Sequence, residues 1–285
     1  MSTLMHRLGR AVRRAREINT ARRTGGPACG HCGFAGSALH RPAHLPAIWP
    51  ALATEWDLSP QWLAWMNDRE GSRCAWCGSS RRASQLAATL VATVNAQRGT
   101  RAGHLRALVR ALASEHAARP LAIAEINSAG NLHRALRRCP GLRYSEFGSR
   151  DPAVPSEDLT RLSYASASFD LAITSDTLEH VPDIDAALRE IWRILKPGAA
   201  HVFTVPVLWD RPTRMRAVIN AGQVQHLLPP SYHGAPGDNA GDFLVFHEFG
   251  ADFVERCTQA GFDTQVVRDA SNPALCTFVA RRPSA

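Results

Sequence analysis

Lysine is almost absent from this chain of 285 residues, in which Lys196 is the only lysine among 33 lysine and arginine side chains. Long apolar segments are absent as well, since no run approaches the ~20 residues that a helix needs to cross a membrane. The arginines near the N-terminus are not followed by the apolar segment of a secretory signal. These absences argue against a membrane-spanning or exported protein, and we expect a cytoplasmic protein whose positive charge comes from arginine.

Positive charge is unevenly distributed along the chain. Residues 1–119 carry 17 basic and 6 acidic side chains, whereas residues 120–285 carry 16 and 19. An enzyme that acts on nucleic acid usually extends positive potential up to its active site. The slightly acidic second part, in which we expect the active site, therefore favours a small-molecule substrate over nucleic acid.

The N-terminal segment Met1–Arg23 has Leu4, Leu8, Val12 and Ile18 at roughly helical spacing among its arginines. This spacing predicts a basic amphipathic helix. We interpret it as a helix that packs on the rest of the chain or on a second subunit of a homo-oligomer. Binding to RNA or to an anionic membrane surface is the alternative.

Four of the seven cysteines form two Cys-x2-Cys pairs, Cys29 with Cys32 and Cys74 with Cys77, and a glycine follows each pair. Four thiolates from two such pairs can close a tetrahedral Zn²⁺ site, and they leave no open position for catalysis. We therefore predict a structural zinc ion. The alternatives are buried free thiols or two disulfides, which are unusual in a chain without an export signal. His31, inside the first pair, is a competing ligand.

Four tryptophans lie between the two cysteine pairs. Because such aromatic density is typical of a packed core, we interpret residues 24–81 as a small zinc-binding lobe. The apolar spacing in Arg82–Gln97 and His104–Ala117 predicts two helices, which form a helical cover over residues 82–119. We place the catalytic domain at residues 120–285.

The stretch from Glu157 to Pro206 predicts one strand, helix and strand unit. Phe169–Thr174 is a continuous apolar run, as expected for a parallel strand that is covered on both faces. Apolar spacing predicts a helix that opens at Pro182-Asp183 and stops at Lys196-Pro197-Gly198, and a second buried strand at His201–Val205. Polar side chains follow the first strand, and ligands bind at the carboxyl ends of strands in open α/β sheets.

Several short motifs in this stretch resemble those of the class I S-adenosylmethionine (SAM) dependent methyltransferases, in particular the branch that acts on small molecules. In chain order they are Glu157-Asp158-Leu159, Ser168-Phe169-Asp170, Leu178-Glu179-His180-Val181, Leu188-Arg189-Glu190 and Leu195-Lys196-Pro197-Gly198. The resemblance implies an α/β, Rossmann-like, seven-stranded sheet with the strand order 3-2-1-4-5-7-6. A predicted helix at Gly250–Ala260 and predicted strands at Phe262–Arg268 and Thr277–Arg281 agree with the way this fold ends.

The resemblance also implies SAM as the cofactor. In the family, an acidic residue and a glycine-rich turn lie at the end of the first strand, which we place at Leu121–Ile126, and the missing side chains let the cofactor approach the backbone. Glu125 and Gly130 fit this pattern. Asn127 and Ala129 depart from it, because they stand where glycines are usual.

By the same resemblance, an acidic residue that ends the second strand, Leu142–Phe147, takes the two ribose hydroxyls, and Glu146 is this residue with Asp151 as its rival. Asp158 accepts from the adenine amino group, with the backbone of the next residue at the ring edge. Ser175 and Asp176 line the methionine end. The predicted cofactor residues are Glu125, Asn127, Gly130, Glu146, Asp158, Leu159 and Ser175.

A long insert rich in glycine and proline, Val207–Glu248, follows the strand, helix and strand unit. Loops of this length are usually lids or binding loops, so we expect it to bind the acceptor; a structural flap or an oligomer contact is the alternative. Methyl transfer is an in-line displacement that depends mainly on orientation, and it needs a base only if the acceptor starts protonated. His180, His226 and His233 are the catalytic candidates, because imidazole titrates near neutrality.

The sequence thus predicts a SAM-dependent methyltransferase that acts on a small-molecule acceptor from a natural-product or glycan pathway. One alternative is an RNA-modifying methyltransferase that uses the zinc lobe and the basic N-terminal part. The other is a non-catalytic protein of the same fold, suggested by the altered glycine turn. The fold alone does not choose among oxygen, nitrogen, carbon and sulfur as the methylated atom.

Overall fold

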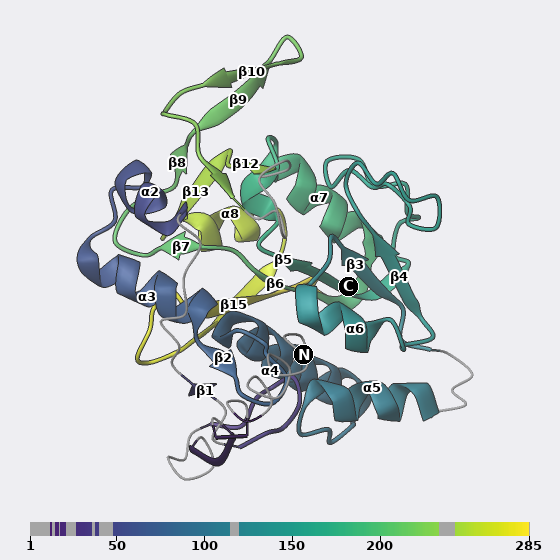
Figure 1. Cartoon of the computed structure of the whole chain (residues 1–285). Helices are drawn as coiled ribbons and strands as arrows, with labels where there is room; N and C mark the ends of the chain where they lie inside the picture. The colour runs from purple at the N-terminus through teal and green to yellow at the C-terminus, as the bar shows by residue number, and fades with distance from the viewer. Residues whose placement is uncertain are drawn as a thin grey trace.

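A computed structural model describes residues 12, 15–16, 18–20, 27–35, 38–39, 48–114, 120–233 and 243–284. A central sheet carries helices on both faces, an N-terminal lobe lies beside it, and a long insert extends beyond it (Figure 1). The predicted helix Met1–Arg23 falls almost wholly outside the described residues. None of the helices in these ranges is long and apolar enough to span a membrane.

The central sheet has six strands within the described residues, in the order β14-β15-β6-β5-β3-β4. The four strands from β6 to β4 are parallel, and β15 is antiparallel to both β6 and β14. In the family's numbering this order is 2-1-4-5-7-6 when read from β4, and an isolated bridge between Glu146 and Ser156 marks the place of the third strand. The predicted fold class is confirmed, with six strands instead of seven. Their bounds are β3 Ile123–Ile126, β4 Leu142–Ser145, β5 Phe169–Ser175, β6 Leu195–Thr204, β14 Asp263–Arg268 and β15 Cys276–Arg281.

Helices cover both faces of the sheet and bury a separate core on each. Neighbouring side chains of a strand point to opposite faces, so Phe203 packs with Leu188 in one core and Val202 packs with Leu90 in the other. The first core lies under α7 and α8, and the second lies under α4, α5 and α6. These helices span α4 Arg81–Arg98, α5 Leu105–Ser114, α6 His133–Leu136, α7 Ile184–Ile194 and α8 Phe253–Gln259.

The junction between α7 and β6 differs from the prediction. α7 begins as expected, because the Asp183 side chain caps it by accepting a hydrogen bond from the Ala186 N–H at 2.9 Å. The helix ends at Ile194, and β6 begins at once at Leu195 instead of at His201. Pairing with β5 is irregular between Phe169 and Leu171, so the segment with Pro197 bulges within the strand, where a missing N–H is tolerated.

The N-terminal lobe packs against the insert as well as against the sheet. Trp56, Trp62 and Met66 of the lobe share a small core with Leu208 and Val245 of the insert. This core joins segments that lie far apart in the sequence, and it fixes the lobe at one end of the sheet. The elements of the lobe are β1 Ala38–Leu39, α2 Ile48–Glu55, α3 Pro60–Gly71 and β2 Arg73–Cys74.

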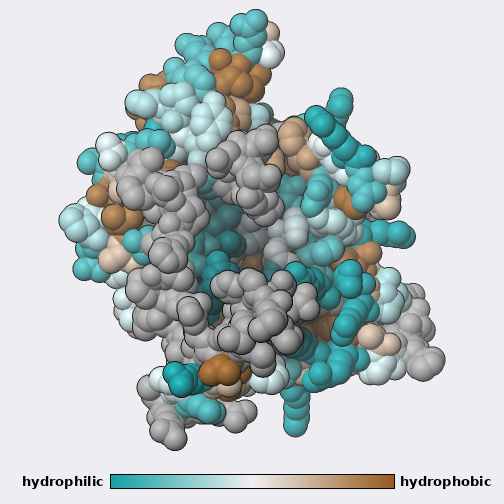
Figure 2. Space-filling view, viewed as in Figure 1, coloured by the Kyte–Doolittle hydropathy of each residue, from teal (hydrophilic) through white to brown (hydrophobic). Residues whose placement is uncertain are grey.

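The insert forms a three-stranded sheet, β7-β13-β8, and a hairpin of β9 and β10 that projects from the molecule (Figure 1). Apolar surface is visible on this hairpin, where Ile219 and Val224 are exposed (Figure 2). Gly250 belongs to β13, so α8 begins later than predicted, at Phe253. The strands of the insert are β7 Val207–Leu208, β8 Arg214–Met215, β9 Ala217–Asn220, β10 Gln223–His226, β11 Tyr232–His233, β12 Phe243–Leu244 and β13 His247–Gly250.

Candidate functional site

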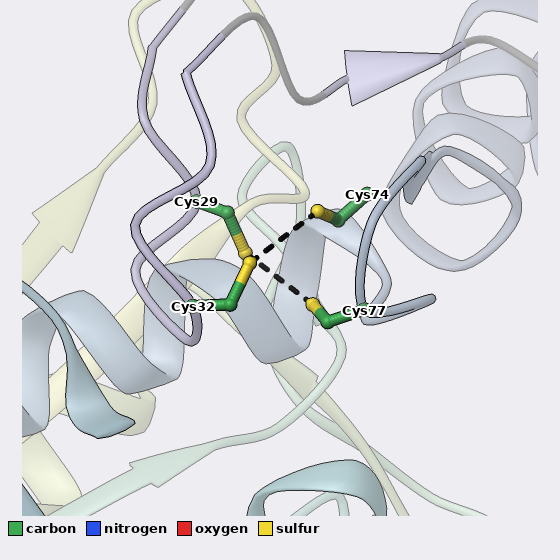
Figure 3. Close-up of side chains that lie close together, drawn as sticks. All are labelled: Cys29, Cys32, Cys74 and Cys77. Atoms are coloured by element: carbon green, nitrogen blue, oxygen red, sulfur yellow. Dashed lines mark hydrogen bonds between the residues drawn. The ribbon is translucent and has the colours of Figure 1, made fainter. Parts of the chain in front are cut away.

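The four paired cysteines converge on one point in the lobe (Figure 3). The sulfur of Cys29 lies 3.7 Å from that of Cys77, and the sulfur of Cys32 lies 3.7 Å from that of Cys74. All four thiols are free, which argues against the alternative of two disulfides. Four sulfurs at ~2.3 Å from a zinc ion in a tetrahedron would be separated by about 3.8 Å. The observed separation fits such an ion.

The surroundings of the cluster support the two turns that carry it. Gly33 and Gly78 adopt left-handed conformations, with φ of 77° and 75°, and their N–H groups donate to the carbonyls of Cys29 and Cys74. His31 is buried beside the cluster, and its Nδ1 lies 2.7 Å from the Ser79 hydroxyl.

Hydrogen bonds from side chains stabilise the turn after β3, in which Asn127 and Ala129 stand where glycines are usual. Asn127 takes the left-handed conformation, with a φ of 58°, that a glycine would adopt, and its Oδ1 accepts from the Phe147 N–H at 2.8 Å. Glu125 is fully buried and accepts from the Ala129 N–H at 2.9 Å, while its second oxygen lies 2.8 Å from Nδ1 of His133. Burial raises the pKa of Glu125, although both contacts oppose the shift. Gly130, with a φ of 59°, has open space where a side chain would begin.

The other predicted cofactor residues lie along the same edge of the sheet. Glu146 follows β4, and its carboxylate accepts a hydrogen bond from the Tyr144 hydroxyl. Asp158 is exposed and accepts from both the N–H and the hydroxyl of Thr160 at 2.8 Å. Leu159 is buried in the core under α7, so the backbone and not the side chain of this residue is available to a ligand.

Ser175 and Asp176, at the carboxyl end of β5, are in contact with two arginines, Arg69 of α3 in the lobe and Arg82 of α4. Arg69 donates to both carboxylate oxygens of Asp176 at 2.7 Å, and Arg82 donates to the Ser175 hydroxyl at 2.5 Å. Burial alone would raise the pKa of Asp176, but the two guanidinium groups outweigh it and lower the pKa. Nothing in the sequence marks this contact, because an isolated arginine gives no signal of a partner that lies about a hundred residues away in the chain.

Two of the three predicted catalytic histidines meet next to Asp176. The rings of His180 and His233 lie 4.8 Å apart, although they come from the turn after β5 and from β11 of the insert. Nδ1 of His180 lies 3.0 Å from the Leu244 carbonyl and donates to it, so the neutral ring has its acceptor at Nε2. Burial lowers the pKa of His233 to about 3, with proximity to His180 as a further cause, and the ring is therefore neutral at neutral pH.

Glu179 completes this group, although nothing in the sequence marks it beyond its place in the motif Leu178-Glu179-His180-Val181. Its side chain is fully buried, and neither carboxylate oxygen has a hydrogen-bond partner among the described residues. One oxygen lies 3.9 Å from Nε2 of His180, and ligand atoms of Glu179, His180 and His233 all lie within 4.8 Å of one another. Burial, reinforced by the nearby Asp176, raises the pKa of Glu179 well above its usual value. A buried carboxylate without a partner is costly, which suggests that a ligand completes the group.

The structure does not bring the third histidine to this place. His226 is exposed at the end of β10, on the projecting hairpin, where it pairs with Ala217. Among the described residues, the site at the carboxyl edge of the sheet thus contains His180 and His233, and His226 lies apart from them. Its role as a catalytic residue stays a prediction.

A cavity of about 500 Å³ lies at the other, amino-terminal edge of the sheet, between Ala122, Gly141 and Phe169. It contains none of the predicted site residues. Ligands of open α/β sheets bind at the carboxyl edge, where the loops carry the polar groups described above. We therefore place the functional site at the carboxyl edge.

Part of the chain is similar to known methyltransferases. Residues 127–203 match the model of a family described as a methyltransferase domain. A curated relative, the ubiquinone biosynthesis O-methyltransferase of Ralstonia nicotianae, is 32% identical over 106 residues, which are 36% of this chain and 43% of that protein. The chain thus matches less than half the length of this relative.

Solved structures with a similar fold include a SAM-dependent methyltransferase from Mesorhizobium loti, at 19% identity and a TM-score of 0.39 over 61% of this chain and 96% of that one. Another is the 1,6-didemethyltoxoflavin-N1-methyltransferase of Burkholderia thailandensis, at 19% identity and a TM-score of 0.37 over 71% of this chain and 89% of that one. Likenesses at these TM-scores support no inference about function.

Proposed function

We propose that this chain transfers a methyl group from SAM to a small-molecule acceptor. The match of residues 127–203 to a methyltransferase domain and the curated O-methyltransferase relative support the proposal. The observation that carries the proposal is the row of polar groups along the carboxyl edge of β3, β4 and β5, which ends in the pair His180 and His233. Such a row can hold a long cofactor at one end and a reacting group at the other.

We assign the cofactor end to the segments after β3 and β4. The left-handed Asn127 and the open space at Gly130 let a ligand approach the backbone, as the usual glycines would. Glu146 and Asp158 offer carboxylates for the ribose hydroxyls and the adenine amino group. Glu125 has a different task in this proposal, because it is fully buried and fastens the turn.

We assign the acceptor end to His180, His233 and Glu179. In the reaction, the bond from the acceptor atom to the methyl carbon forms as the bond from that carbon to the sulfonium breaks, and S-adenosylhomocysteine leaves. An acceptor hydroxyl loses its proton in this step, and Nε2 of His180 takes it. The Leu244 carbonyl fixes the ring for this role, because it holds the proton on the other nitrogen. The unpartnered Glu179 accepts a hydrogen bond from a second donor of the acceptor molecule.

We further propose that Cys29, Cys32, Cys74 and Cys77 bind one structural Zn²⁺ ion. The sulfur separations of 3.7 Å fit a tetrahedral site, and four thiolates fill it without an open position. In this proposal the ion stabilises the lobe and has no chemical step of its own.

Calorimetry with SAM tests the cofactor assignment. We expect wild-type protein to bind SAM, and E146Q or D158N to weaken the binding about tenfold, which corresponds to about 1.4 kcal/mol for one lost polar contact. D263N, which alters an exposed aspartate at the far edge of the sheet, serves as the matched control and should bind like wild type. Absence of binding heat with wild-type protein would favour the non-catalytic alternative.

Transfer of labelled methyl groups tests the acceptor assignment. The labelled cofactor is incubated with a panel of small hydroxyl, amine and thiol compounds, and in parallel with tRNA and rRNA fragments. We expect label in a small molecule, a turnover reduced about 10²-fold or more in H180A, and a reduction in H233A, both with unchanged SAM affinity. Label only in RNA would contradict the small-molecule proposal, and full turnover in H180A would remove His180 as the base.

A further inference from the structure

Asp176 is held in a backbone conformation that residues other than glycine rarely adopt. Its φ is 47°, and its N–H donates to the Thr204 carbonyl at 2.9 Å. Strained residues of this kind persist only where their surroundings over-determine them, and they are concentrated at functional sites. Here the surroundings include the two hydrogen bonds from Arg69, whose guanidinium is almost fully buried.

A second arginine, in α4, reinforces this contact. Arg82 lies 3.2 Å from Asp176, donates to the neighbouring Ser175 hydroxyl, and shares Glu70 with Arg69. Two guanidinium groups and two carboxylates therefore balance their charges in one network. Bidentate pairs of this type are directional, so the network fixes the orientation of Asp176 and not only its charge.

The two arginines reach this place because the second cysteine pair joins the helices that carry them. Arg69 lies near the end of α3, Arg82 lies in the first turn of α4, and the turn Cys74–Cys77 connects the two helices. The connection is tight, since the Arg81 N–H donates to the Ser72 carbonyl at 2.9 Å and the Cys74 N–H donates to the Ser79 carbonyl at 2.8 Å.

The first cysteine pair is fastened to the same helix. The Gly30 N–H donates to the Ser84 hydroxyl of α4 at 3.0 Å, and a Cβ on Gly30 would lie only 2.3 Å from the Ser84 carbonyl oxygen. An ion bound by both pairs would therefore clamp α4 from two sides. The start of α4, which carries Arg82, is thus set by the geometry of the sulfur cluster.

We propose that Arg69 and Arg82 are positioning residues that hold Asp176 at the methyl-transfer end of the site, and that the four-cysteine cluster sets their placement. In this proposal the lobe contributes to the active site. Loss of the metal then disorders the segment after β5 before it disorders the rest of the sheet. The catalytic meaning of this coupling rests on the proposed methyltransferase function, whereas the coupling itself is a structural property that is measured without any acceptor.

Hydrogen exchange of the full-length, zinc-loaded protein tests the coupling. We expect the amides of residues 176–181 to exchange at least about tenfold faster in R69Q and after removal of zinc with a chelator, while β3 and β4 exchange as in wild type. R69K, which keeps the charge but loses the bidentate geometry, should give an intermediate rate. Because R69Q keeps the metal, the test remains decisive even if the chelated protein unfolds.

R81Q is the matched control. Arg81 is the direct neighbour of Arg82 and pairs with Asp68 and Asp269 instead of with Asp176. We expect R81Q to leave the exchange of residues 176–181 unchanged. The proposal would be overturned if exchange of this segment accelerated equally in R81Q and R69Q. It would also be overturned if this exchange were unchanged in R69Q, or in chelated protein that stays folded. A wild-type protein that shows the coupling but binds no SAM would refute the proposed function and leave the coupling intact.

Discussion

The sulfur cluster of the lobe and the group around Glu179 are both polar sites assembled from segments that lie far apart in the sequence. They differ in how their polar atoms are matched. Each sulfur of the cluster has another sulfur at a distance that suits one shared tetrahedral ion. Glu179 has no hydrogen-bond partner for either oxygen among the described residues, and it is fully buried.

The sulfur cluster is a closed site, because its ion would complete it, whereas the group around Glu179 is an open site that lacks a hydrogen-bond donor. A tetrahedral site of four thiolates is complete with its ion and stabilises the fold. A buried carboxylate without a partner destabilises the protein, so its presence points to a ligand that supplies the missing donor. Removing a group should therefore have opposite effects on stability at the two sites.

The largest effect is expected at the sulfur cluster. C74S should abolish zinc binding and lower the free energy of unfolding by about 3–5 kcal/mol, because metal-binding energy is folding energy at a structural site. Metal content by mass spectrometry and denaturant unfolding measure both quantities. C139A is the control, since Cys139 is buried but isolated from the cluster, and it should cost no more than about 1.5 kcal/mol. Retained zinc in C74S, or equal losses in both variants, would refute the closed-site interpretation.

E179Q is expected to raise the free energy of unfolding, by less than C74S lowers it. Because the pKa of Glu179 is raised in the folded protein, the wild type loses stability relative to E179Q as the pH rises above the unfolded value of about 4.5. The slope of this difference is at most about 1.4 kcal/mol per pH unit. Urea unfolding of both proteins at several pH values between 5 and 9 measures it.

E190Q provides the control for this pH dependence. The hydrogen bond from Arg193 lowers the pKa of Glu190, so its contribution to stability is present above the unfolded value and lost as the pH falls. The difference between wild type and E190Q should therefore stay constant between pH 5 and 9, and it should shrink only as the pH falls below about 4.5. A pH-independent difference for E179Q would show that Glu179 has a partner in solution.

The smallest effect on stability is expected at the turn after β3. This turn is strained, but hydrogen bonds from within the chain stabilise it. N127A should cost about 1–2 kcal/mol, because alanine tolerates the left-handed conformation poorly and loses the contact with the Phe147 N–H. N127G keeps the conformational freedom and should stay within about 1 kcal/mol of wild type. Thermal unfolding with and without SAM measures stability and affinity together. Equal losses in both variants would mean that the hydrogen bond, and not the conformation, makes asparagine suitable here.

Much of the fold could be predicted from local patterns. The apolar runs at β3, β5 and β15, and the capped helix after Asp183, all lie close to where their periodicity places them. The predicted bounds of an element were wrong where tertiary contacts override local signals. At Leu195, for example, a sequence that predicts a turn continues directly into strand β6. The third strand was expected from the family and is reduced to the bridge between Glu146 and Ser156.

The sequence by itself determined the α/β fold class and the two cysteine pairs, because apolar periodicity and the spacing of ligand pairs are local properties of the chain. Its short motifs carried the resemblance to the methyltransferase family. Only the tertiary structure decided that His180 meets His233 while His226 lies apart, and that Arg69 and Arg82 hold Asp176. Such contacts depend on how the lobe and the insert pack at the edge of the sheet. A single histidine or arginine gives no signal of its distant partner, since long-range packing is set by the whole core.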